Sequence, residues 1–385
     1  MALHFERSEF DARRDRLIIE MAEKKLDAIL LFAQESMYWL TGYDTFGFCF
    51  FQCLVVKVDG SMTLLTRSAD LRQARQTSII ENIVLWTDRE GSNPALDLRN
   101  LLNDLDLLGA RIGVEYDTHG LTAYNGRRVD ELLSTFGQIA DASGIVSRLR
   151  LFKSPAEIKK VEKAAELADA ALDAALPLIK QGTDEGLILA AMQGAIFEGG
   201  GDYPANDFII GSGTDALLCR YKSGRRKLNK NDQLTLEWAG VYNHYHAAMM
   251  RTVLTGKASR RHQELFEAAR DALLAVEKAM TPGNTFGDVF DAHARTMEAH
   301  GLTKHRLNAC GYSLGARFAP SWMDMPMFFQ GNPEPIAPDM TLFAHMIIMD
   351  SETETAMTLG RTYLTTETQP RPLSRHDLDL IVTSS

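Results

Sequence analysis

The spacing of hydrophobic positions changes near residue 150 and divides the chain into two predicted domains. Before this point, short apolar runs alternate with segments whose apolar residues recur at helical spacing. Predicted strands lie at 28–32, 53–58, 62–66, 83–86 and 111–116, and predicted helices lie near 93–106 and 121–135. Asp59-Gly60 suits the turn of a hairpin between two of these strands. The order of elements predicts an α/β domain over residues 1–150.

The first helix of this domain is predicted from a capping pattern. Ser8 is followed three residues later by Asp11, and the pair resembles a capping box. Apolar residues then recur at helical spacing as far as Met21. We therefore expect a helix that is capped by Ser8.

Beyond residue 150, the pattern predicts an α+β domain over residues 151–385. Ser154-Pro155 precedes a long helix, because proline suits the first helical turn. Predicted strands lie at 233–238, 247–254, 341–350 and 355–366, and predicted helices lie near 260–280 and 285–300. Strands that form pairs and helices that are grouped apart from them favour this fold class.

Composition narrows the partners without identifying a function. The 385 residues carry a net charge of −10, which argues against nucleic acid and anionic membranes as partners. No apolar run approaches the roughly 18 residues of a membrane span. The N-terminus lacks the apolar core of a signal peptide, so we expect a cytoplasmic protein. Four cysteines without a C-x-x-C pair predict neither a disulfide framework nor a thiolate zinc site.

One carboxylate interrupts an apolar predicted strand. Alternation along the strand places Glu237 on the opposite face from Leu236 and Trp238. A buried carboxylate costs free energy unless it is paired. Glu237 is therefore either half of a structural ion pair or a nucleophile or general base whose pKa the environment adjusts.

Other polar segments admit both a structural and a functional interpretation. His244 and His246 share one strand face, but no nearby carboxylate or cysteine completes a metal site, which favours two hydrogen-bonded histidines. The basic run 220–227 is either a solvated loop or a site that captures an anionic group. The segments 308–317 and 318–329 combine glycine, aromatic and methionine residues in a loop-like setting, which favours a ligand pocket.

Two motifs make the chain similar to a known family. Tyr38-Trp39-Leu40-Thr41-Gly42-Tyr43 and Leu151-Phe152-Lys153-Ser154-Pro155 resemble the N-terminal signature and the linker of the creatinase/aminopeptidase P family. The resemblance implies a creatinase-like N-terminal domain over 1–150 and a pita-bread catalytic domain over 151–385.

Peptidases of this family hold two metal ions with two aspartates, one histidine and two glutamates. The resemblance places these five positions at Glu237, Ala248, Tyr312, His345 and Gly360. One carboxylate remains, whereas two metal ions need several converging oxygen ligands. We therefore expect no metal and no other cofactor.

Within the family, longer runs resemble the ectoine hydrolases. They include Leu236-Glu237-Trp238-Ala239-Gly240, the stretch 306–315, and 319–324. This resemblance implies a homodimer that opens the cyclic amidine of ectoine to an acetylated diaminobutyrate, which a separate deacetylase then processes. Three alternatives remain: a creatinase-like amidinohydrolase, although creatinase has a histidine at the position of Arg220, a non-catalytic pita-bread binding scaffold, and a true metallopeptidase.

The resemblance also suggests roles for individual residues. Glu237 is the expected nucleophile or base, His345 or His246 the proton donor, and Tyr312 a hydrogen-bond partner of the tetrahedral centre. Arg220 or Arg317 is expected to bind the substrate carboxylate. The remaining predicted substrate-binding residues are Trp39, Tyr43, Phe46, Trp238, Trp322 and Asp324.

Overall fold

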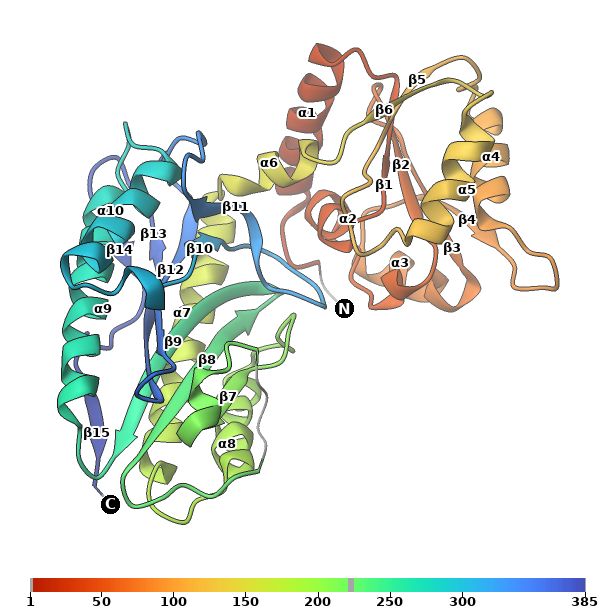
Figure 1. The fold of residues 1–385 in the computed structure, drawn as a ribbon. Coiled ribbons are helices and arrows are strands. Elements are labelled where there is room, and N and C mark those ends of the chain that lie inside the picture. The colour runs from red at the N-terminus through yellow and green to blue at the C-terminus, as the bar shows by residue number, and fades with distance from the viewer. Residues whose placement is uncertain (1–2, 221–224, 385) are drawn as a thin grey trace. The chain divides into compact units, whose positions relative to one another are not determined.

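The computed structural model describes residues 3–220 and 225–384, and the chain forms two compact units (Figure 1). Unit 1 comprises Met1–Arg150 and unit 2 comprises Leu151–Ser385. Unit 1 is a mixed α/β domain and unit 2 is an α+β domain, which confirms the predicted fold class. Within the described ranges, no helix combines the length and the apolar character that crossing a membrane requires.

Unit 1 is built on a six-stranded sheet with the order β4-β3-β2-β1-β5-β6. Its strands are β1 (Ala28–Leu31), β2 (Cys53–Lys57), β3 (Met62–Arg67), β4 (Asn82–Trp86), β5 (Arg111–Val114) and β6 (Gln138–Asp141). Its helices are α1 (Arg7–Glu23), α2 (Gln34–Thr41), α3 (Leu71–Thr77), α4 (Pro94–Asp104), α5 (Ala123–Leu133) and α6 (Ile145–Leu151), which ends at the first residue of unit 2. The sheet is mixed, since β1 pairs antiparallel with β2 and parallel with β5.

Two predictions for unit 1 meet different outcomes. The hairpin of β2 and β3 is confirmed, and its turn includes Gly60 with a positive φ of 85°. The predicted cap at Ser8 is wrong, because α1 begins at Arg7 and Glu6 is its N-cap in an extended conformation. Ser8 therefore lies inside the first turn and makes no capping bond.

The aromatic segment near residue 40 belongs largely to the interior of unit 1. Trp39 and Tyr43 are fully buried in a core cluster with neighbours from β1, β2 and β3. Their rings are packed inside the core of unit 1, which argues against the predicted contact of these two residues with substrate. Phe46, by contrast, is 81% exposed, and its role in binding stays a prediction.

Unit 2 is built on a nine-stranded sheet whose main path is β11-β10-β12-β13-β9-β8-β7. Its longer strands are β7 (Ile209–Ser212), β8 (Asp232–Tyr242), β9 (Tyr245–Thr255), β10 (Ala309–Ser313), β11 (Asp324–Phe329), β12 (Thr341–Asp350) and β13 (Thr355–Leu364). Two short strands, β14 (Arg371–Pro372) and β15 (Ile381–Thr383), pair with β13 and β9. Its helices are α7 (Pro155–Ala175), α8 (Glu185–Glu198), α9 (Arg260–Ala279) and α10 (Phe286–Ala299).

Helix α7 determines which face of the sheet is covered. Ser154 and Glu157 form a capping box at its start, as the Ser154-Pro155 pattern predicts for a helix beginning here. The helix packs against β8 and β9, where the indole nitrogen of Trp238 donates to the carbonyl of Ala168 at 2.8 Å. Gly240 permits this close approach, because an added Cβ would lie 1.9 Å from the carbonyl oxygen of Ala164. Trp238 and Gly240 thus face α7.

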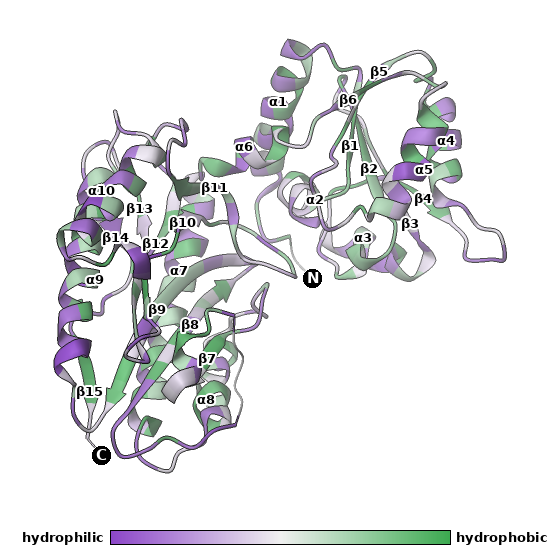
Figure 2. Cartoon of the chain, in the orientation of Figure 1, coloured by the Kyte–Doolittle hydropathy of each residue, from purple (hydrophilic) through white to green (hydrophobic). Residues whose placement is uncertain are grey.

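Helices α9 and α10 cover the other half of the face on which α7 lies. Arg361 of β13 donates to Glu277 of α9 at 2.7 Å, and α9 also packs against β12. Helix α9 carries both hydrophobic and hydrophilic turns, as Figure 2 shows, since one side packs against the strands. Residues of β8, β9, β12 and β13 that point away from these helices form the opposite face of the sheet.

The sheet of unit 2 curls, and hydrogen bonds hold the curl. The backbone N–H of His246, at the start of β9, donates to the carbonyl of Gly315 at 3.2 Å. Arg317 donates its N–H to the carbonyl of His244, and Tyr245 pairs with Ala316. The chain that follows β10 therefore pairs with the start of β9, although β12 and β13 separate these strands along the sheet.

The loop-like setting predicted for residues 308–317 is wrong in its central part. Ala309–Ser313 forms β10, which is hydrogen-bonded to β12 on one side and to β11 on the other. Part of the segment 318–329 likewise forms the edge strand β11. The glycine and aromatic residues of this segment therefore belong to a strand whose register shifts against β11, rather than to an irregular loop.

Candidate active site

A row of paired residues crosses the sheet of unit 2 on the face opposite α7. Glu237 of β8 pairs with Met250 of β9, Met250 pairs with Gly360 of β13, and Gly360 pairs with His345 of β12. Directly paired residues place their side chains on the same face. Because Trp238 faces α7, its neighbour Glu237 faces the other way, and so does the whole row.

Glu237 is a buried acid with an altered proton affinity. Its side chain is 8% exposed, and burial raises its pKa to about 7. The positive charge of Arg220 and a hydrogen bond from Tyr312 act in the opposite direction. Near neutral pH the residue therefore exists in both protonation states, which suits a group that attacks as a carboxylate and also carries a proton.

Tyr312 lies on β10, and the curl of the sheet brings its hydroxyl group close to Glu237 on β8. Its hydroxyl donates to the Oε1 atom of Glu237 at 3.4 Å, and it accepts a hydrogen bond from the indole nitrogen of Trp322 at 2.9 Å. Burial and the nearby carboxylate raise the pKa of Tyr312 well above its ordinary value. The residue is therefore a hydrogen-bond donor and not a base.

His345 lies beside Tyr312 in the same site. Its ring lies 5.6 Å from the ring of Tyr312 and 5.4 Å from that of Phe343, measured between centroids. Burial lowers its pKa to about 3, and the neighbouring His293 and Arg220 act in the same direction. At neutral pH this imidazole is uncharged and lacks the extra proton that a general acid would donate. The expectation that His345 is the proton donor is therefore not supported.

His246 is also uncharged and is held by the backbone. Its Nε2 atom accepts the N–H of Ala205 at 3.0 Å, which places the ring proton on Nδ1. Burial lowers the pKa of His246 to about 3. The pairing of His246 with Val241 places it near the end of β8, four residues along from Glu237. These contacts favour a structural role and argue against proton donation by His246.

Arg220 supplies positive charge to the site. It follows a 3-10 turn at Gly213–Leu217, and its side chain is exposed. Burial raises the pKa of Glu237, Tyr312 and the half-buried thiol of Cys219, and the charge of Arg220 offsets part of each rise. The guanidinium therefore lies close enough to influence each of these groups. Part of the basic run, residues 221–224, lies outside the described residues.

Arg317 is engaged within its own segment. Its guanidinium lies 3.5 Å from Asp324 and donates to the carbonyl of Ser321 at 3.3 Å. Asp324 is buried and also accepts the N–H of Met325 at 3.1 Å. Because Arg317 and Asp324 compensate each other, Arg220 is the better candidate for binding a substrate carboxylate.

Two tryptophans predicted to wall the substrate occupy different places. Trp238 faces α7 on the opposite side of the sheet from Glu237, so its predicted substrate contact is wrong. Trp322 lies beside Tyr312 and belongs to the site. Sequence reasoning missed Phe343, which pairs with Tyr312 and contacts His345. The two-residue spacing of Phe343 and His345 along β12 is the signal that both share one face.

The donor atoms of this site do not fit a two-metal centre. Along the row, Met250 and Gly360 separate the single carboxylate from the imidazole. The position that resemblance equates with a second aspartate is Ala248, which shares the face of Glu237 but has no ligating atom. Among residues 3–220 and 225–384, no three His, Cys, Asp or Glu side chains are grouped so that they could hold a metal ion.

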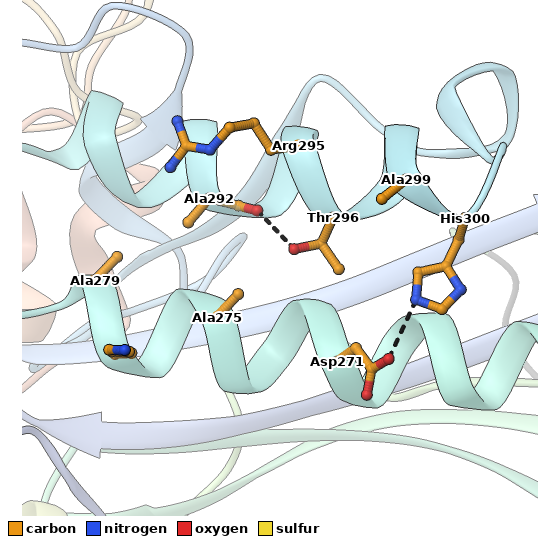
Figure 3. A pocket seen from close by; sticks show the side chains of 9 residues that line it. Asp271, Ala275, Ala279, Ala292, Arg295, Thr296, Ala299 and His300 are labelled. Carbon is orange, nitrogen blue, oxygen red and sulfur yellow. Dashed lines mark hydrogen bonds and ion pairs between the residues drawn. The ribbon is translucent and has the colours of Figure 1, made fainter.

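A separate groove lies on the outer helical layer, between α9 and α10. Figure 3 shows small side chains along it, with a hydrogen bond between His300 and Asp271 near one end and Arg295 toward the other. Thr296 bonds back to the carbonyl of Ala292 within α10. None of the residues that line the groove belongs to the row or contacts Glu237.

The fold and the site together define a two-domain, creatinase-like enzyme. The model of the creatinase/prolidase N-terminal domain matches residues 13–152, and that of metallopeptidase family M24 matches residues 159–367, more than half of the chain. The chain belongs to metallopeptidase family M24 and is a hydrolase of this family.

Individual relatives support the same assignment. An ectoine hydrolase of Halomonas elongata is 28% identical over 364 residues, which is 89% of each chain. A crystal structure of a dipeptidase from Mycobacterium ulcerans matches with a TM-score of 0.86 at 20% identity, over 99% of this chain and 100% of that one. The X-Pro aminopeptidase of Thermotoga maritima matches with a TM-score of 0.83 at 19% identity, over 96% and 99%. These structural similarities concern the fold.

Proposed function

We propose that the protein is a metal-independent hydrolase that opens the cyclic amidine of ectoine to N-acetyl-diaminobutyrate. The observation that carries the proposal is the buried Glu237 carboxylate, whose pKa of about 7 and contact with Tyr312 suit a reacting group. The similarity to an ectoine hydrolase supports the choice of substrate. The cytoplasmic location, the homodimer and a deacetylase acting on the product belong to the same proposal.

The chemistry of the substrate matches the groups that the site offers. Ectoine carries a cyclic amidinium group and a carboxylate. The carbon between the two nitrogens already shares a positive charge, so it accepts a nucleophile without activation by a metal ion. Glu237 faces the amidinium, and Arg220 pairs with the carboxylate. Phe343 and Met250 form an apolar part of the wall and floor.

The reaction adds one water molecule across one C–N bond. Either the Glu237 carboxylate attacks the amidine carbon and water later displaces it, or Glu237 removes a proton from a water molecule that attacks directly. In both cases the C–O bond forms as electrons move onto nitrogen, and one ring C–N bond then breaks. The oxygen of the water becomes the acetyl carbonyl, and its two hydrogens end on the released amine.

Glu237 is a better candidate than either histidine for the residue that carries the proton. His345 and His246 are uncharged at neutral pH, since the pKa of each is about 3. In the route through activated water, the Glu237 carboxylate accepts a proton from water and returns it to the departing nitrogen, and its pKa of about 7 suits both steps. The Tyr312 hydroxyl donates its one proton to Glu237 and so orients the reacting carboxylate.

The test is incubation of the purified protein with ectoine, hydroxyectoine, creatine and a Xaa-Pro dipeptide, with products identified by mass spectrometry. Ectoine is expected to gain the mass of one water molecule. Hydrolysis of creatine alone would instead support a creatinase-like amidinohydrolase, and cleavage of the dipeptide would support a peptidase. If none of the four compounds reacts, the non-catalytic binding scaffold becomes the better explanation.

A further inference from the structure

Three buried side chains of unit 2 form a directed hydrogen-bond chain, which joins Trp322 and Tyr312 to Glu237, 75 positions before Tyr312 in the sequence. The indole nitrogen of Trp322 donates to the hydroxyl of Tyr312 at 2.9 Å, and that hydroxyl donates to Glu237 at 3.4 Å. Trp322 is 1% exposed and Tyr312 is 3% exposed. Bulk water therefore does not compete for either hydrogen bond.

The chemistry of the first group sets the direction of the chain. An indole N–H can only donate, whereas a tyrosine hydroxyl has one proton and two lone pairs. Because Trp322 occupies a lone pair of the Tyr312 oxygen, the hydroxyl proton must point toward another acceptor. The acceptor within reach is the Oε1 atom of Glu237.

Both aromatic rings are held in place, which leaves the hydroxyl proton as the adjustable element. The Trp322 backbone N–H donates to the side chain of Asn206 at 3.0 Å, and its ring lies 6.4 Å from that of Phe208. The Tyr312 ring contacts Phe343 edge-on at 5.4 Å. Ring packing leaves the hydroxyl free to rotate about its C–O bond. The hydrogen bond from the Trp322 indole is what restricts this rotation.

We propose that Trp322 is a positioning residue that directs the hydroxyl proton of Tyr312 onto Glu237 and so holds the carboxylate in one reactive orientation. The proposal rests on the role given to Glu237 under the proposed function. It replaces the substrate-wall role that the sequence suggested for Trp322. Trp322 acts through Tyr312 and touches no reacting atom.

The length of the second bond agrees with a positioning role. An O–H···O bond is normally 2.5–3.0 Å long, so a separation of 3.4 Å is a weak contact before substrate binds. Hydrogen bonds at active sites often shorten when charge develops in the reacting complex. A hydroxyl already aimed at Glu237 strengthens that bond without reorientation.

The test uses Trp322→Phe, Tyr312→Phe and the double variant. Trp322→Phe keeps an aromatic ring but removes the N–H donor. The matched control is Trp86→Phe in unit 1, where the indole nitrogen donates to the carbonyl of Phe51 at 2.9 Å. Each variant is assayed for kcat and KM with ectoine. The unliganded proteins are labelled with ¹³Cζ-tyrosine, and the Tyr312 signal is assigned from its loss in Tyr312→Phe.

Trp322→Phe is expected to lower kcat about tenfold, the effect of one net hydrogen bond, with KM changed by less than about twofold. In the Tyr312→Phe background it should cause no further loss, because its partner is already absent. The Tyr312 signal should shift in Trp322→Phe and stay unchanged in Trp86→Phe. Unchanged thermal stability would show that the fold is intact.

Additive losses in the double variant, or an unchanged Tyr312 signal in Trp322→Phe, would overturn the proposal. The spectroscopic arm needs no substrate, so it remains decisive even if ectoine is not hydrolysed. In that case the assay refutes the proposed substrate, while the ¹³C signal still decides whether Trp322 orients Tyr312.

Discussion

The hydroxyl of Tyr312 lies 3.4 Å from the carboxylate of Glu237, although their strands are not neighbours in the sheet. Strands β9, β13 and β12 separate β8 from β10. At roughly 4.8 Å between adjacent strands, a flat sheet would place the two backbones about 19 Å apart. The curl of the sheet, held by the pairing of Tyr245 with Ala316, brings them together. Curvature therefore builds this site as much as the side chains do.

Replacement of Glu237 by Gln is expected to remove turnover while leaving the fold intact. Gln has nearly the same shape and still accepts the Tyr312 hydrogen bond, but it can neither attack as a carboxylate nor carry the proton. We expect kcat to fall by about 10³-fold or more. The measurement is ectoine hydrolysis followed by mass spectrometry, with circular dichroism as the check on folding. Activity within tenfold of the parent protein would contradict the assignment.

The dependence of kcat/KM on pH should report the ionisation of Glu237. Burial raises its pKa to about 7, and only the deprotonated form can attack or accept a proton. Activity is therefore expected to be low at pH 5 and to rise with a midpoint near pH 7. A rate that is flat between pH 5 and 8 would show that a different group performs the reaction.

Removal of the positive charge at Arg220 should affect binding and ionisation together. In Arg220→Gln, the substrate carboxylate loses its partner, so KM is expected to rise by about tenfold or more. The pKa of Glu237 should also move up, since the charge of Arg220 lowers it. The midpoint of the pH profile is therefore expected to shift to higher pH. Arg317→Gln serves as the comparison, and an equal rise of KM there would indicate that both arginines bind substrate.

Treatment with a chelator tests whether the reaction needs a metal ion. The row contains one carboxylate and one imidazole separated by Met250 and Gly360, so we expect ectoine hydrolysis to persist after dialysis against EDTA. A metal-dependent peptidase of the same family, treated alongside, should lose its activity. Loss of ectoine hydrolysis that added Mn²⁺ or Zn²⁺ restores would contradict the metal-independent proposal.

Local patterns predicted most elements, because each is encoded within a short stretch of chain. The helix start at Pro155 and the Asp59-Gly60 turn are examples. Alternation also placed Glu237 on the face opposite Trp238. The contact of Glu237 with Tyr312 was not predictable in this way, because it joins residues 75 positions apart through a curl that no local pattern encodes. Trp39 was misread because a dense aromatic segment suits a buried core as well as a ligand wall.

A second buried carboxylate, Glu115 in unit 1, should control stability rather than activity. Its Oε2 atom accepts the N–H groups of Phe32 and Ala33 at 3.0 and 2.8 Å, and Ser36 donates to Oε1 at 2.6 Å. These bonds fix the start of α2. Burial nevertheless dominates and raises the pKa of Glu115 from 4.5 to about 7.

The sign of the pH effect follows from this raised pKa. The folded state binds the proton more tightly than the unfolded state, so the stabilisation is complete below pH 4.5 and is lost as the pH rises through 7. The loss is on the order of 3 kcal/mol. In Glu115→Gln, the amide oxygen can accept both backbone N–H groups while the nitrogen faces Ser36, so the stability of unit 1 should vary much less with pH. Urea denaturation at pH 5 and pH 8 measures the difference, with the exposed Glu131→Gln as the control, and an equal pH dependence in the parent protein and Glu115→Gln would contradict the prediction.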